Sequence, residues 1–228
     1  MTVLASSILT RVREIAVDTG AVARWSDAEL MRYLSDGQRT IAAVYPDQVS
    51  KVAVMQLAEG TLQSLPADGE SLLTIYRNMG TNGTTPGRAV RLIRREILDD
   101  QNPTWHSDAK VSTIYNFVYD PLDPTAFFVY PPSNGLGYIQ LNYCYNPPEI
   151  TATSDAISLP DIYITPLVDY VLYKAHQKDS DYAAGQERAV AHLQAFQLFL
   201  QGRDTKDEET SPNQSLGPFN PSVSGAAR

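Results

Sequence analysis

The sequence has little of what several common protein classes require. Cys144 is the only cysteine, which excludes an intrachain disulfide and a cysteine-rich metal cluster. No apolar run reaches the roughly 18 residues of a membrane-spanning helix. The first apolar stretch is interrupted by Arg11, Arg13 and Glu14, unlike the core of a signal peptide. We therefore expect a soluble protein that is made in a cytoplasm and has no membrane partner.

Positive charge is also scarce. The 228 residues include 18 Lys and Arg against 26 Asp and Glu, for a net charge of −8. Proteins that wrap nucleic acid need clustered cations, so this balance argues against such a role. Hydrophobic residues make up 43% of the chain, which is enough to bury a sizeable core.

Motifs for catalysis and for cofactor binding are missing. The loop GTNGTTPG at residues 80–87 lacks the Lys of a P-loop, and no Gly-x-Ser-x-Gly occurs. His106 lies near Asp99, Asp100 and Asp108, but their spacing matches no established set of metal ligands and a polar turn explains them more simply. We predict no enzyme activity, no cofactor and no metal; a metal-dependent hydrolase at His106 is the less favoured alternative.

Helical patterns occupy the N-terminal part. Apolar residues recur at helical spacing from Leu4 to Ile15, which predicts a first helix capped at Gly20. Ser26 stands at the N-cap position of a second helix, with Glu29 at the capping-box position. We expect this second helix to stop at Pro46.

A second helix pair is predicted near the C-terminus. Helical spacing returns after Asp161 and continues to Ala175, and a last helix has Ala189, Leu193, Phe196 and Leu200 on one face. Because the link between the two helices is short, we expect them to be antiparallel neighbours. His176 and His192 lie on these helices and face either one another or solvent.

The middle of the chain has the alternation of β-strands. Residues 51–57 and 71–77 are expected to be strands, and residues 115–120, 126–131 and 137–145 are expected to form an antiparallel meander. The alternation places Phe127 and Val129 opposite Phe128 and Tyr130. We interpret these aromatic residues as scaffold. The alternatives are a carbohydrate- or base-stacking platform that uses Tyr130 or Tyr138, and an interface with another protein.

These elements predict an α+β fold. Residues 1–48 and 159–202 are expected to form one antiparallel helical bundle, with a β-rich insertion at residues 49–158. From residue 203 to 228 large apolar residues are almost absent, so this segment is predicted to be an extended tail without its own core.

Two features are candidates for a functional role. Arg88, Arg91, Arg94 and Arg95 are concentrated within one segment of an acidic chain. They are either a solvated surface or an electrostatic contact with an acidic partner, which is another copy of the chain or DNA. The tail is either a disordered terminus or a docking arm.

Five segments together resemble a known family. They are RWSDAELMRYLSDGQRTIAAVYPD at 24–47, GTLQSLPAD at 60–68, VYDPLDPTAFFVYPP at 118–132, LNYCYNPPEI at 141–150 and LVDYVLYKAHQKDSDYA at 167–183. In their order and spacing they are similar to the head-to-tail connector, or adaptor, proteins of tailed bacteriophages, in the short-tailed branch.

The resemblance implies a structural virion protein at the head–tail junction. It would form a homo-oligomeric ring, of twelve copies, beneath the portal protein and above a downstream tail or nozzle protein. Genomic DNA would pass through its channel during packaging and ejection without sequence-specific binding. By the resemblance the tail is a portal-docking arm, with Asp204, Pro212, Leu216, Phe219 and Pro221 as contact residues. The alternative function is a carbohydrate- or receptor-binding phage module that uses the Tyr-rich sheet.

Overall fold

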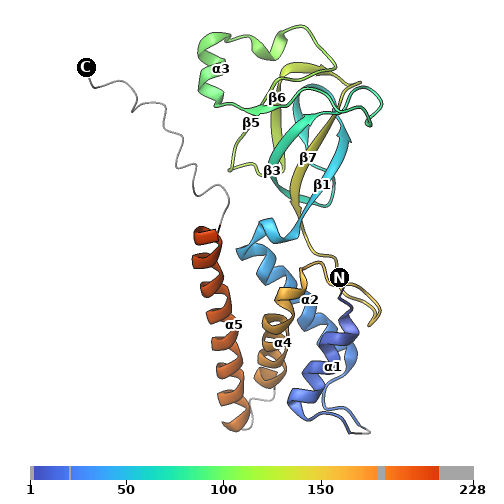
Figure 1. Ribbon diagram of the computed structural model, residues 1–228, viewed down its shortest axis with the longest axis vertical. Helices are drawn as coiled ribbons and strands as arrows, with labels where there is room; N and C mark the ends of the chain where they lie inside the picture. The colour runs from blue at the N-terminus through green and yellow to red at the C-terminus, as the bar shows by residue number, and fades with distance from the viewer. Residues whose placement is uncertain (1–2, 21, 179–182, 211–228) are drawn as a thin grey trace, which may run out of the picture. The chain divides into compact units, whose positions relative to one another are not determined.

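The computed structural model describes residues 3–20, 22–178 and 183–210, and it has the predicted α+β class (Figure 1). The chain divides into two compact units. The helical unit comprises the chain up to Gly37, Ile150–Ala156 and the chain from Asp161; the β unit comprises Gln38–Glu149 and Ile157–Pro160. The domain boundaries drawn from the sequence remain predictions.

Four helices contribute to the helical unit: α1 (Ala5–Ala16), the first part of α2 (Asp27–Val44), α4 (Ile164–Lys178) and α5 (Ala183–Thr210). Ser26 caps α2 as expected, because its hydroxyl accepts a hydrogen bond from the Glu29 amide at 3.3 Å. The helix ends two residues before Pro46, which opens the 3₁₀ helix η1 (Pro46–Val49).

Helices α4 and α5 lie side by side and antiparallel, as predicted (Figure 1). Their contacts run in opposite chain directions: Tyr163 meets Phe199 at 6.0 Å between ring centroids, Tyr170 meets Phe196 at 5.2 Å, and His176 meets His192 at 6.0 Å. Phe196 is buried, so the apolar face of α5 is used for this contact.

The end of α1 differs from the prediction. The helix is closed by Val17, in the left-handed conformation with φ of 56°, and not by Gly20. Two ion pairs explain why the chain turns here. The Arg13 guanidinium binds the Asp18 carboxylate at 2.7 Å and the Asp27 carboxylate at 2.5 Å, and the buried Asp18 also accepts the Arg24 amide.

Two sheets pack face to face in the β unit. One has the order β1 (Ser50–Gln56), β7 (Tyr138–Tyr145), β3 (Gly69–Asn78); the other has the order β2 (Glu59–Ser64), β6 (Ala126–Asn134), β5 (Asn116–Tyr119), β4 (Arg91–Leu92). All pairs are antiparallel except β4 and β5. The core between the sheets takes residues from both, including Leu57, Leu72, Phe117, Phe127, Ile139 and Leu141.

The predicted three-stranded meander is wrong. Strands β5 and β6 do pair, but β7 belongs to the other sheet, where it lies between β1 and β3. The prediction also missed β2, which lies in the segment read as a connection. Alternation along a strand fixes which side chains share a face, but it does not identify the neighbouring strand.

Strands β5 and β6 are covered on both faces. Phe117, Phe127 and Val129 enter the core between the sheets. On the other face, Val118 is buried with Leu98 and Trp105, and Phe128 and Tyr130 pack against them. Leu98 comes from α3 (Arg95–Gln101) and Trp105 from the 3₁₀ helix η2 (Trp105–Ser107). The interpretation of the aromatic run as scaffold is therefore confirmed.

Helix α5 continues to Thr210, beyond the predicted boundary at residue 203, so the backbone at Asp204 is helical. The other tail residues singled out in the sequence, Pro212, Leu216, Phe219 and Pro221, lie outside the described residues. None of the described helices combines the length and the apolar character that a membrane crossing requires.

Candidate functional site

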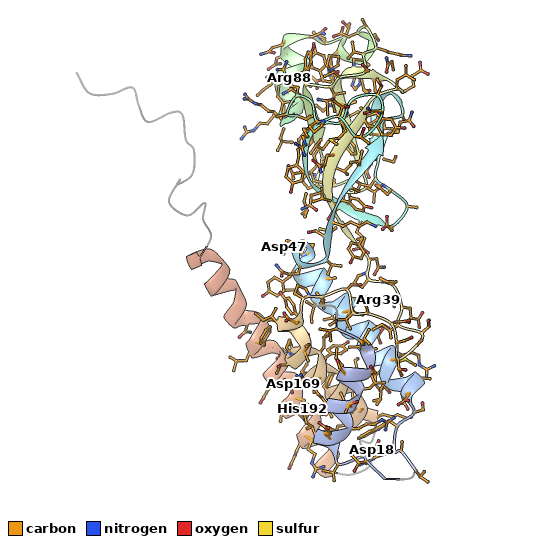
Figure 2. The ribbon with its side chains drawn as sticks, turned by 45° about the vertical axis from the view of Figure 1, so that its right-hand side comes forward. Asp18, Arg39, Asp47, Arg88, Asp169 and His192 are labelled. Carbon is orange, nitrogen blue, oxygen red and sulfur yellow. The ribbon has the colours of Figure 1, made fainter. Side chains whose placement is uncertain are left out.

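The arginine-rich segment begins where a buried amide holds two loops together. Asn78 is 3% exposed, and its side chain donates to the carbonyl oxygens of Arg88 and Ile114 at 2.9 and 2.8 Å. It also accepts the Ile114 amide at 2.9 Å. The Arg88 side chain is exposed and lies over the ring of Tyr115, 4.4 Å from its centroid (Figure 2). The backbone at Arg88 is thus fixed, while its charge faces outward.

Arg91 lies on the short strand β4 at the edge of its sheet. The Arg91 and Ile93 amides donate to the Tyr115 and Phe117 carbonyl oxygens at 3.1 and 2.9 Å. The side chains of Arg91 and Leu92 are both exposed. The other edge of β4 pairs with no strand in the described part of the chain. This edge therefore combines a cation with an apolar residue, as protein interfaces often do.

Arg94 and Arg95 begin α3. Arg94 occupies the N-cap position, and its side chain is exposed with no ion-pair partner among the described residues. Arg95 is partly engaged, since its Nε lies 3.3 Å from the Asp99 carboxylate and its guanidinium 5.9 Å from the Phe128 centroid. Arg94 is therefore the freer cation of the two.

These residues border a groove of about 520 Å³, which we call the arginine groove. Its lining is Leu92, Ile93, Arg94, Arg95, Glu96, Val118, Tyr119, Asp120, Pro121 and Phe128. The floor is apolar because Val118 and Phe128 belong to the core beneath α3. Glu96 and Asp120 lie on the same rim as the two arginines. The unpaired guanidinium of Arg94 above an apolar floor favours a ligand that carries both an apolar group and a carboxylate.

The acidic cluster around His106 is engaged in the scaffold. His106 stacks on Trp105 at 3.6 Å between centroids, and its Nδ1 lies 2.9 Å from the Thr61 hydroxyl. Asp99 accepts the Trp105 indole N–H at 2.8 Å, and Asp108 accepts the Asn102 amide at 2.7 Å. No group of three or more His, Cys, Asp or Glu side chains in the described residues is arranged to hold a metal ion. The site favours a structural role over a hydrolase.

The lone thiol has the properties of a core residue. Cys144 is 2% exposed on β7. Burial raises the pKa of the Cys144 thiol, an effect that a hydrogen bond with Ser71 only partly opposes. A thiol that is buried and predominantly protonated is a poor nucleophile.

His176 and His192 face one another. Their rings stack with an interplanar angle of 9°, and the His192 Nδ1 lies 2.9 Å from the Asp169 carboxylate (Figure 2). His176 is buried and also meets the ring of Trp25 edge-on at 5.5 Å. These contacts connect α4, α5 and the residue Trp25 just before α2. They are therefore packing contacts within the helical unit.

The tyrosines of the alternative carbohydrate-binding hypothesis are half-buried. Tyr130 packs edge-on against Trp105 at 6.2 Å, and the Tyr138 hydroxyl donates to Gln56 at 3.1 Å. A stacking platform needs an open ring face. Their contacts favour a structural role instead.

Sequence reasoning identified the four arginines but missed the groove beside two of them. Its lining comes from residues 92–96, 118–121 and 128, which the parallel pairing of β4 with β5 brings together. A pairing between strands about 25 residues apart leaves no local signal. Asp120 and Pro121, at the end of one expected strand and the start of its connection to the next, form part of the rim.

Comparison with known proteins identifies the family of the chain. No curated protein matches the sequence. The family model of the SU10 adaptor protein matches residues 1–216, which is nearly the whole chain. This chain, a structural component of a bacteriophage virion, belongs to the SU10 adaptor protein family.

Proposed function

We propose that the protein forms a homo-oligomeric ring, of twelve copies, beneath the portal of a short-tailed phage. The ring would join head to tail and continue the DNA channel during genome packaging and ejection. The observation that carries this proposal is the match to the adaptor family over residues 1–216. Portal and tail proteins are the partners that an adaptor at this junction would contact.

In this proposal the helical pairs form the body of the ring and the chain end reaches the portal. Residues 204–228, with Asp204, Pro212, Leu216, Phe219 and Pro221, would be the docking arm. Several copies acting together in a ring would compensate for a weak contact made by each single arm.

The four arginines would serve a protein contact rather than a contact with DNA. The chain carries a net charge of −8. A channel wall with many cations would bind the genome through counterion release and would slow its passage. Arg91 and Arg94 are exposed and have no ion-pair partner among the described residues, which leaves them available to an acidic partner.

The test is the sedimentation mass of the full chain, alone and mixed with its portal ring. We expect a ring-sized complex on mixing, and its loss when residues 204–228 are removed. If the full chain ignores the portal, both the adaptor role and the docking arm are wrong. If the full chain binds the portal and the truncated chain binds it equally well, only the docking arm is wrong.

A further inference from the structure

Among the described residues, the most exposed large apolar side chain lies beside the arginine groove. Leu122 is 92% exposed, at the turn between β5 and β6. Asp120 and Asp123 flank it, and both are exposed. A lone exposed leucine needs no explanation, but a leucine between two carboxylates carries the two kinds of group that the arginine groove selects.

This turn, which we call the DPLDP tip (residues 120–124), is held rigidly. The Asp120 carboxylate accepts the Leu122 amide at 2.9 Å, and the Asp120 carbonyl accepts the Asp123 amide at 3.0 Å. The Pro124 carbonyl accepts the Leu72 amide at 3.3 Å. Pro121 and Pro124 further restrict the backbone. A tip that is ordered before binding loses little conformational entropy when it docks.

The tip cannot fill the groove of its own chain. Asp120 and Pro121 form part of that groove's rim, yet Leu122 remains 92% exposed. The tip therefore points away from the groove that it borders. A tip from another molecule is free to enter.

The two surfaces are complementary. The groove has an apolar floor at Ile93, Val118 and Phe128. Its rim carries Arg94, Arg95, Glu96 and Asp120, and of the two cations Arg94 has no ion-pair partner in the described residues. Its volume of about 520 Å³ has room for a leucine with an adjoining proline. Leu122 matches the floor, and Asp123 matches the exposed guanidinium of Arg94.

We propose that the DPLDP tip of one copy docks in the arginine groove of a second copy, with Leu122 on the apolar floor and Asp123 beside Arg94. This inference deepens the proposed protein contact of the arginines and rests on the proposed self-assembly. Every copy carries both a tip and a groove, so each copy can both donate and accept the contact.

Two charge reversals, Arg94→Asp and Asp123→Arg, test the contact. Each variant alone has a tip and a groove of like charge. We therefore expect the protein concentration needed for self-assembly to rise at least about tenfold. An equimolar mixture restores opposite charges at every contact when the two variants alternate. We therefore expect the mixture to regain the sedimentation mass of the unaltered chain.

Folding does not confound this test. Asp is a favourable N-cap residue, so Arg94→Asp does not weaken α3. Asp123 is exposed, and its side chain accepts only a 3.3 Å hydrogen bond from Thr125. Glu70→Arg, at an exposed position of β3, is the matched control for Asp123→Arg with the same change in charge and should assemble normally. Leu122→Ala tests the apolar part and should weaken assembly without any change in charge.

Three outcomes are distinguishable. Loss in each single variant with recovery in the mixture supports the contact. Normal assembly of Arg94→Asp, Asp123→Arg and Leu122→Ala overturns it and leaves the ring proposal intact, and so does loss that the mixture does not recover. An unaltered chain that stays monomeric with and without its portal overturns the ring and this contact together.

Discussion

The two units differ in the residue type that adopts a left-handed backbone conformation. In the β unit, each described residue with positive φ is a glycine, at Gly60, Gly80, Gly83 and Gly135. In the helical unit the corresponding residue is Val17, which is β-branched and 84% exposed. Valine is strongly disfavoured in this conformation because its branched Cβ crowds the backbone. The turns of the β unit are therefore relaxed, whereas the end of α1 is strained.

The units also differ in how they join distant segments. The β unit uses a buried amide: Asn78 bridges the backbone of Arg88 and Ile114. The helical unit uses closely packed helix faces together with ion pairs from Arg13 to Asp18 and Asp27. Loss of the Asn78 amide and a change of volume between α2 and α4 therefore test the two arrangements separately.

The largest effect is expected at Asn78 in the β unit. Asn78→Leu keeps the size of the side chain but removes the side-chain partner of the Ile114 amide and carbonyl, and one of the two hydrogen bonds that the Arg88 carbonyl accepts. We expect a loss of about 3–5 kcal/mol in the free energy of unfolding, measured by denaturant titration. Asn82→Leu, in the exposed loop before Arg88, is the matched control and should cost far less. Equal losses in the two variants would contradict a stabilising role for the buried hydrogen bonds of Asn78.

A smaller effect is expected at Gly37 in the helical unit. A Cβ there would lie 2.9 Å from Cδ1 of Tyr170 and 3.2 Å from Cδ2 of Leu167, so α2 and α4 could not keep their separation. We expect Gly37→Ala to lower the free energy of unfolding by about 1–3 kcal/mol, as measured by thermal unfolding. Gly202→Ala on α5 meets nothing within 4 Å and should instead stabilise by about 0.5–1 kcal/mol. The same sign for both would contradict close packing at Gly37.

Two carboxylates give weaker, pH-dependent effects. A hydrogen bond from Lys178 lowers the pKa of Glu29 in the helical unit, and one from Lys51 lowers the pKa of Asp68 in the β unit. A lowered carboxylate pKa stabilises the fold above the unfolded value, near 4, and this contribution is lost as the pH falls through the folded pKa. The Glu29 side chain is 13% exposed and that of Asp68 46% exposed, so Glu29 is the better shielded from solvent.

We therefore expect Glu29→Gln to lower the free energy of unfolding by about 1 kcal/mol at pH 7, and Asp68→Asn to lower it by less than about half of that. Both differences should vanish near pH 2, as measured by unfolding at the two pH values. A cost that persists in acid would mean that packing, and not charge, is responsible.

The smallest effect is expected at Val17. Val17→Gly removes the strained Cβ, which is worth about 1–2 kcal/mol, but makes the unfolded chain more flexible by nearly as much. We expect a net stabilisation of about 0.5 kcal/mol. Val22→Gly, which is similarly exposed at 89% but has no positive φ, should not stabilise. Equal responses would remove strain as the explanation.

The helices were predictable because their signals are local. The Ser26 cap, the stop before Pro46 and the apolar face of α5 depend on neighbours within one or two turns. Pairing of β7 with β1 joins residues such as Val52 and Asn142, and no local pattern reports such a distant partner. Val17 was missed because an ion pair, and not a glycine, fixes that turn.

For the function, the five motifs predicted a phage adaptor, and the family match confirms that much. The short-tailed branch, the twelve-fold ring and the docking residues stay predictions. The four arginines could be identified from the sequence because they are concentrated in one segment of a chain whose net charge is −8. The groove could not, because it exists only after β4 and β5 have paired.

The two-sided burial of β6 limits how this family can vary in length. Alternate residues of β6 enter two different cores, with Phe127 and Val129 on one side and Phe128 and Tyr130 on the other. Inserting or deleting one residue in the strand would exchange the two sets and empty both cores at once. In the loop at residues 80–87 the same change displaces only exposed or half-exposed side chains. Related sequences should therefore keep the length of β6 constant and concentrate their gaps in that loop.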